Sequence, residues 1–223
     1  MKWLSGAWAV FAKDVRLELR SRYAVNTLLM FVLSSILLIL FAVGQEPVGA
    51  RIQSGLLWIV TLFAASVGLG RSFMSEEDRG TVLLLQLNTR PSMVYAGKLF
   101  FNFLLLLVLV IVAVVAMVLL LSIRVDFAGL LALTILLGSL GLAGATTLLA
   151  ALIARAAAHG PLLPVLLFPI LVPLLMSVVT ASRHALDGGL GWSGAGEELT
   201  TLIGFAGVVI TASVLLFDFV WND

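Results

Sequence analysis

The spacing of charged residues constrains this chain more than any other feature of its sequence. Six intervals of 19 to 28 residues contain no Asp, Glu, Lys or Arg: 23–45, 52–70, 99–123, 127–154, 156–182 and 199–217. A helix needs about 20 apolar residues to cross about 30 Å of hydrocarbon, because it rises about 1.5 Å per residue. The intervals therefore predict an all-α integral membrane protein with six spanning helices, at about 24–44, 53–72, 99–122, 127–154, 161–181 and 199–218.

Composition narrows the classes of function that such a chain can have. Hydrophobic residues make up 61% of the chain and charged residues only 11%, against about 25% charged in soluble domains. This excludes a water-soluble enzyme, and a net charge of +1 argues against nucleic-acid binding. The sequence has no cysteine, no Walker loop and no Ser/His/Asp set at one depth. We expect a single non-catalytic transmembrane domain over residues 1–223, with no catalytic, cofactor or metal site.

The basic residues predict which side of the membrane each end occupies. Ten of the 13 Lys and Arg residues fall in the N-terminal segment and in the loops after the second and fourth spans. The remaining three fall in the other loops. Because Lys and Arg concentrate in cytosolic loops, this asymmetry predicts a multi-pass protein with both termini in the cytosol.

Residues 1–22, before the first span, have the pattern of an amphipathic helix. Apolar side chains recur every three or four residues, at Leu4, Trp8, Phe11, Val15 and Leu19. The cations Lys13, Arg16 and Arg20 fall toward the other side. The pattern predicts a helix in the membrane interface, with its apolar face in lipid and its cations near anionic headgroups. A simple basic anchor for the first span is the alternative.

The loop between the second and third spans is the longest cytosolic one. Ser75 and the acids Glu76, Glu77 and Asp78 form a capping-box pattern before a short apolar run, 80–87, which is closed by Pro91. The run is too short to span a membrane, and it predicts a short helix at the cytosolic surface. Two interpretations stay open from these residues: a connector that reverses the chain, or a docking element for a soluble partner.

Two of the predicted spans contain residues that affect how a helix packs or bends. Small residues crowd the fourth span and predict close helix packing: Gly138, Ser139, Gly141, Gly144, Ala145, Thr146 and Thr147. The fifth charge-free interval contains four prolines, Pro161, Pro164, Pro169 and Pro173. Proline removes a backbone donor and kinks a helix. We expect a bent or interrupted fifth span, with the kink at Pro164, Pro169 and Pro173.

Several of these segments together resemble a known family. The stretch 71–81, followed by Leu87, Pro91 and Lys98, resembles the signature after the second span of exporter-type ABC permeases. Within that superfamily the chain resembles the CcmB family, the haem exporter permeases of cytochrome c maturation. That likeness covers nearly the whole chain, including the opening 11–20, Gly55-Leu56-Leu57-Trp58 and the proline-rich stretch 162–175.

The resemblance implies a permease subunit of an ABC transporter in the bacterial cell inner membrane. Such a subunit dimerises, binds two copies of a cytosolic ATPase subunit, and associates with a tryptophan-rich haem-handling membrane protein and a small single-span subunit. It couples ATP hydrolysis by the ATPase to haem export, or to release of a haem-loaded chaperone at the periplasmic side. The residues implied to dock the ATPase are Glu76, Glu77, Asp78, Gly80, Thr81, Leu84 and Leu87.

Haem is then a substrate of the complex and not a cofactor of this chain. The family's haem-handling partner carries a tryptophan-rich motif with flanking histidines, and this sequence contains no such motif. Two other functions remain open: an ABC exporter permease for a lipid, glycan or drug, and a membrane scaffold or ATP-independent channel.

Overall fold

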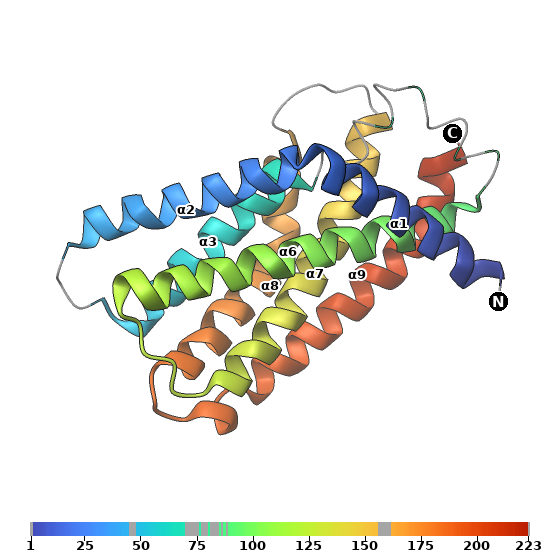
Figure 1. Cartoon of the computed structure of the whole chain (residues 1–223). Coiled ribbons are helices and arrows are strands. Elements are labelled where there is room, and N and C mark those ends of the chain that lie inside the picture. The colour runs from blue at the N-terminus through green and yellow to red at the C-terminus, as the bar shows by residue number, and fades with distance from the viewer. Residues whose placement is uncertain are drawn as a thin grey trace.

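A computed structural model describes residues 2–44, 48–69, 76, 80, 85, 87, 89–155 and 162–222, and within them the chain is a bundle of long helices (Figure 1). The elements are α1 (Lys2–Ser21), α2 (Tyr23–Val43), α3 (Ala50–Gly68), α6 (Pro91–Leu121), α7 (Ala128–Arg155), α8 (Leu162–Leu186), the 3₁₀ helix η1 (Gly191–Ser193) and α9 (Gly196–Asn222). No strand occurs among the described residues, and the predicted all-α fold is confirmed.

Among the described residues, six helices are long and apolar enough to cross a membrane, which confirms the predicted number. They cover Ala24–Val43, Ala50–Gly68, Pro91–Leu121, Ala128–Ile153, Phe168–Leu186 and Gly196–Phe219. The third spanning helix begins at Pro91 rather than near residue 99, and it therefore includes Lys98. With six spans, both chain termini lie toward the same end of the bundle (Figure 1).

Helix α7 is the most enclosed span, and its small residues explain how its neighbours approach it. Residues 141–147 are all buried. A side chain at Gly138 would collide with the ring of Trp58 on α3, and one at Gly141 would collide with Leu174 on α8. Helices in lipid associate by such close backbone approach, so the fourth span forms the predicted packing face. Helices α2 and α9 are the least buried spans and lie at opposite edges of the bundle (Figure 1).

Two hydrogen bonds between buried polar side chains link neighbouring helices. The indole Nε1 of Trp58 donates to Ser182 Oγ at 2.9 Å and links α3 to α8. Asn102 Nδ2 donates to Thr147 Oγ1 at 2.9 Å and links α6 to α7. Buried polar groups without partners are costly in an apolar surrounding, so these bonds help to fix which helices are neighbours.

The N-terminal helix α1 turns sharply into the first span. Arg22, between the two helices, has a left-handed backbone conformation with φ 51°. Glu18 accepts a hydrogen bond from the backbone N–H of Val25, at 2.8 Å, and so satisfies one of the unpaired donors at the start of α2. This turn lets α1 leave the direction of α2 and lie along the first part of α6 (Figure 1).

The fifth span is a single helix across two of its prolines. Pro169 and Pro173 both lie inside α8, and the helix continues without a break from Leu162 to Leu186. Pro164 lies within the same helix, whereas Pro161 falls outside the described residues. The expected interruption is therefore not seen from Leu162 onward, and the kink at Pro164, Pro169 and Pro173 stays a prediction.

Candidate functional site: a buried charge cluster at the start of the third span

The feature of this bundle that most needs an explanation is a lysine with no exposed surface. Lys98 lies on the second turn of α6 and its side chain is 0% exposed. A charged group in such a place requires opposite charges close by. Its Nζ lies 3.3 Å from Asp14 Oδ2 on α1 and 3.5 Å from Glu76 Oε1 in the loop before α6.

A second lysine completes a group that we call the four-charge cluster, consisting of Lys13, Asp14, Glu76 and Lys98. Lys13 Nζ lies 3.3 Å from Asp14 Oδ1 and also forms an ion pair with Glu76. The side chains of Asp14 and Glu76 are 7% and 8% exposed, and that of Lys13 is 33% exposed. Among the described residues, two cations therefore share two carboxylates, and all of these side chains except that of Lys13 are buried.

Close packing between α1 and α6 brings these charges together. Gly97 precedes Lys98, and a Cβ built there would lie only 2.7 Å from the backbone oxygen of Ala7. The absence of a side chain lets the backbones of α1 and α6 approach. Phe11 then packs edge-on against Phe100, with ring centroids 4.7 Å apart.

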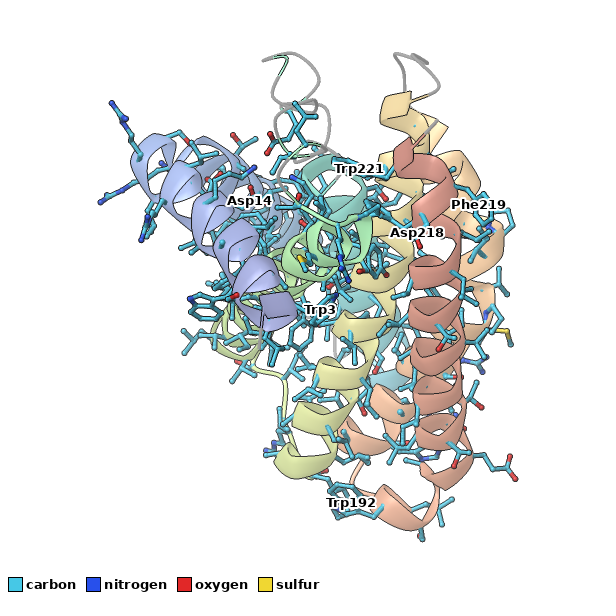
Figure 2. The ribbon with its side chains drawn as sticks, turned by 90° about the vertical axis from the view of Figure 1, so that its right-hand side faces the viewer. Trp3, Asp14, Trp192, Asp218, Phe219 and Trp221 are labelled. Atoms are coloured by element: carbon cyan, nitrogen blue, oxygen red, sulfur yellow. The ribbon has the colours of Figure 1, made fainter. Side chains whose placement is uncertain are left out.

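The residues predicted for the interfacial helix divide between two faces of α1. Phe11 is buried and Lys13 belongs to the four-charge cluster. Trp8 is 61% exposed, and Arg16 and Arg20 are exposed as well. Helix α1 therefore binds α6 with one face, and its outer face carries aromatic and basic side chains that suit a membrane interface. Figure 2 shows Asp14 on α1 near the end of the bundle that holds Trp221, and far from Trp192.

The residues predicted to dock an ATPase do not all point the same way. Glu76 turns toward α1 and α6, where it pairs with the two lysines. Leu87 is 82% exposed. Gly80 has φ 63°, a turn conformation that favours glycine. Four more predicted docking residues lie outside the described residues: Glu77, Asp78, Thr81 and Leu84.

Sequence reasoning missed Asp14 and the structural role of Lys98. A weak signal for Asp14 was present, because it follows Val10 and Phe11 by one helical turn and therefore shares their buried face. Lys98 looks like the boundary of a span in the sequence, since a charge normally ends an apolar interval. Within the described part of the chain, no group of three or more His, Cys, Asp or Glu side chains is placed to hold a metal ion.

Comparison with known proteins places this chain in a family. The family described as CcmB protein matches residues 5–220. The chain is 28% identical over 204 residues to Heme exporter protein B of Bradyrhizobium diazoefficiens, covering 91% of each chain.

Two more relatives carry the same name. The Heme exporter protein B of Rhodobacter capsulatus is 30% identical over 182 residues, covering 81% of this chain and 84% of that protein. The Haemophilus influenzae protein is 28% identical over 169 residues, covering 75% and 76%. With six spans in the expected order and a family match over nearly its whole length, this chain belongs to the CcmB family.

Proposed function

We propose that this chain is the permease subunit of an ABC transporter for cytochrome c maturation. It couples ATP hydrolysis by a partner subunit to haem export, or to release of a haem-loaded chaperone, at the periplasmic side. The observation that carries the proposal is the CcmB match over residues 5–220, supported by three relatives named Heme exporter protein B. The proposed location is the bacterial inner membrane, and the 10-to-3 distribution of Lys and Arg supports both termini in the cytosol.

The proposed function requires partners that supply energy and handle haem. The sequence has no Walker loop, so we propose that two copies of a cytosolic ATPase subunit bind a dimer of this chain. A tryptophan-rich haem-handling membrane protein and a small single-span subunit complete the proposed complex. In this arrangement haem is a substrate of the complex and not a cofactor of this chain.

The loop between α3 and α6 is the proposed docking element for the ATPase. Leu87 carries this part of the proposal, because it is 82% exposed on the longest cytosolic loop. Covering this leucine by a partner removes apolar surface from water, which favours binding of the partner. Glu76 faces α1 and α6, so we propose that other residues of the loop contact the ATPase. Glu77, Asp78, Thr81 and Leu84 stay predicted docking residues.

Co-purification of the ATPase subunit with this chain tests the proposal. Leu87→Asp removes an apolar contact that is worth roughly 2–4 kcal/mol if it is an interface anchor. Affinity for the ATPase should then fall by about one and a half to three decades, at about 1.4 kcal/mol per decade. Leu190→Asp is the matched control, because Leu190 is also exposed, at 67%, but immediately precedes η1, whose Trp192 lies at the other end of the bundle.

The comparison is made at equal amounts of each variant in the membrane. We expect Leu87→Asp to lose the ATPase and Leu190→Asp to retain it. Undiminished recovery of the ATPase with Leu87→Asp rejects the loop as the docking element.

A further inference from the structure

The four-charge cluster joins three segments that are far apart in the sequence. Lys98 on α6 contacts Asp14 on α1 and Glu76 in the loop. We propose that Lys98 is a positioning residue for transport: its ammonium group holds α1 and the docking loop to α6, so that the three segments move together. This proposal rests on the proposed function, because it assumes that the ATPase acts on the loop.

The charge balance of the cluster explains why the segments should not separate. If the loop moved alone and carried Glu76 away, Lys13 and Lys98 would each lose a carboxylate partner. Removing one partner from a buried ion pair is strongly unfavourable, because the remaining charge is left uncompensated away from water. Movement of the loop is therefore less costly when α1 and α6 follow it.

The packing around the cluster fits such a rigid connection. Gly97 lets the backbones of α1 and α6 come into close contact immediately beside Lys98. Trp3 Nε1 donates to Ser92 Oγ at 3.0 Å and ties the other end of α1 to the first turn of α6. Helix α6 then continues unbroken to Leu121. A displacement at its first turns thus reaches the opposite end of the bundle.

Distances between paired spin labels test the connection directly. The sequence contains no cysteine, so labels can be attached at Arg16→Cys on α1 and Leu119→Cys on α6 without background labelling. Both positions are exposed. In the protein reconstituted in lipid nanodiscs, we expect a narrow distance distribution for the parent protein and for Lys98→Arg, and a broad one for Lys98→Met.

A matched control distinguishes a specific role of Lys98 in positioning α1 from a general loss of packing around α6. Asn102 lies one turn further along α6 and is also fully buried, but its side chain binds Thr147 on α7. Asn102→Leu should therefore leave the distance between α1 and α6 narrow. The proposal is overturned if the distance distribution of Asn102→Leu is as broad as that of Lys98→Met. It is also overturned if the distribution of Lys98→Met is as narrow as that of the parent protein.

The same variants are also tested for function in the whole complex. Lys98→Met should retain the ATPase subunit but lower the yield of haem-loaded cytochrome c by about tenfold or more, which corresponds to about 1.4 kcal/mol or more. Loss of the ATPase together with cytochrome c would show that Lys98 only shapes the docking surface, which contradicts the proposal. If the parent protein itself recovers no ATPase, the proposed function fails, and the label distances still decide on the role of Lys98.

A charge exchange keeps the test decisive if Lys98→Met does not accumulate in the membrane. The double variant Lys98→Asp with Asp14→Lys preserves the net charge of the cluster and restores an attraction between α1 and α6. We expect it to accumulate and to show a narrower distance distribution than Lys98→Asp alone. Failure of the second substitution to improve either property overturns the proposal.

Discussion

Substitution of Gly97 by alanine perturbs the contact between α1 and α6 by a single methyl group. In the structure, that methyl carbon would lie 2.7 Å from the backbone oxygen of Ala7 and 2.7 Å from Cβ of Val10. Optimal separations between carbon atoms are about 3.5–4.0 Å, so the contact is too short by about 0.8 Å. Neither atom is the end of a flexible side chain, so helix α1 itself must move away from α6.

The expected loss of stability follows from two opposing effects. Overpacking of a well-packed contact costs about 1–3 kcal/mol, and alanine gains about 1 kcal/mol over glycine as a helix former. Gly97→Ala should therefore lower the free energy of unfolding by about 0–2 kcal/mol. Gly204→Ala on α9 is the matched control, because no atom lies within 4 Å of its added methyl group. It keeps only the gain of about 1 kcal/mol.

Reversible unfolding in mixed detergent micelles measures this difference. The free energy of unfolding of Gly97→Ala should be lower than that of Gly204→Ala by about 1–3 kcal/mol. The same displacement of α1 would lengthen the 3.3 Å distance between Lys98 and Asp14. Equal or higher stability of Gly97→Ala would refute the close packing of α1 on α6 on which the four-charge cluster depends.

Two further predictions concern the core and the topology. Trp58→Phe should lower the free energy of unfolding by about 1–3 kcal/mol in the same assay, because it leaves the buried Ser182 without its 2.9 Å donor; an unchanged value would mean that this bond does not hold α3 to α8. Reporter fusions at Gly189 and at Asp223 should label opposite sides of the membrane, because ten basic residues lie on one side and three on the other; labelling on the same side contradicts the six-span topology.

The number and order of the spans could be predicted because a spanning helix depends on local composition. Each charge-free interval of the sequence corresponds to one of the six helices. The small residues of the fourth span were also informative, since close packing requires small side chains wherever the neighbour lies. The prediction for α7 therefore needed no knowledge of Trp58 or Leu174, the residues that fill the space beside Gly138 and Gly141.

The start of the third helix and the candidate site depend on contacts between distant segments. A lysine in the sequence marks the end of a spanning helix only when no buried carboxylate pairs with its ammonium group. Lys98 lies inside α6 because carboxylates 84 and 22 positions away, Asp14 and Glu76, surround it. Hydrophobic periodicity along one segment does not show such partners. The same limit applies to Glu76, whose contacts with Lys13 and Lys98 could not be predicted from its own segment.

The most direct test of the proposed function is the maturation of c-type cytochromes in the bacterium that carries this chain. The gene is deleted, and the cells are then complemented with the parent protein, Leu87→Asp or Leu190→Asp. Covalently bound haem in membrane and periplasmic proteins is measured by peroxidase staining after denaturing electrophoresis. We predict that the deletion abolishes haem-stained c-type cytochromes, and that the parent protein and Leu190→Asp restore them while Leu87→Asp does not. Normal c-type cytochromes in the deletion strain would contradict a role for this chain in their maturation.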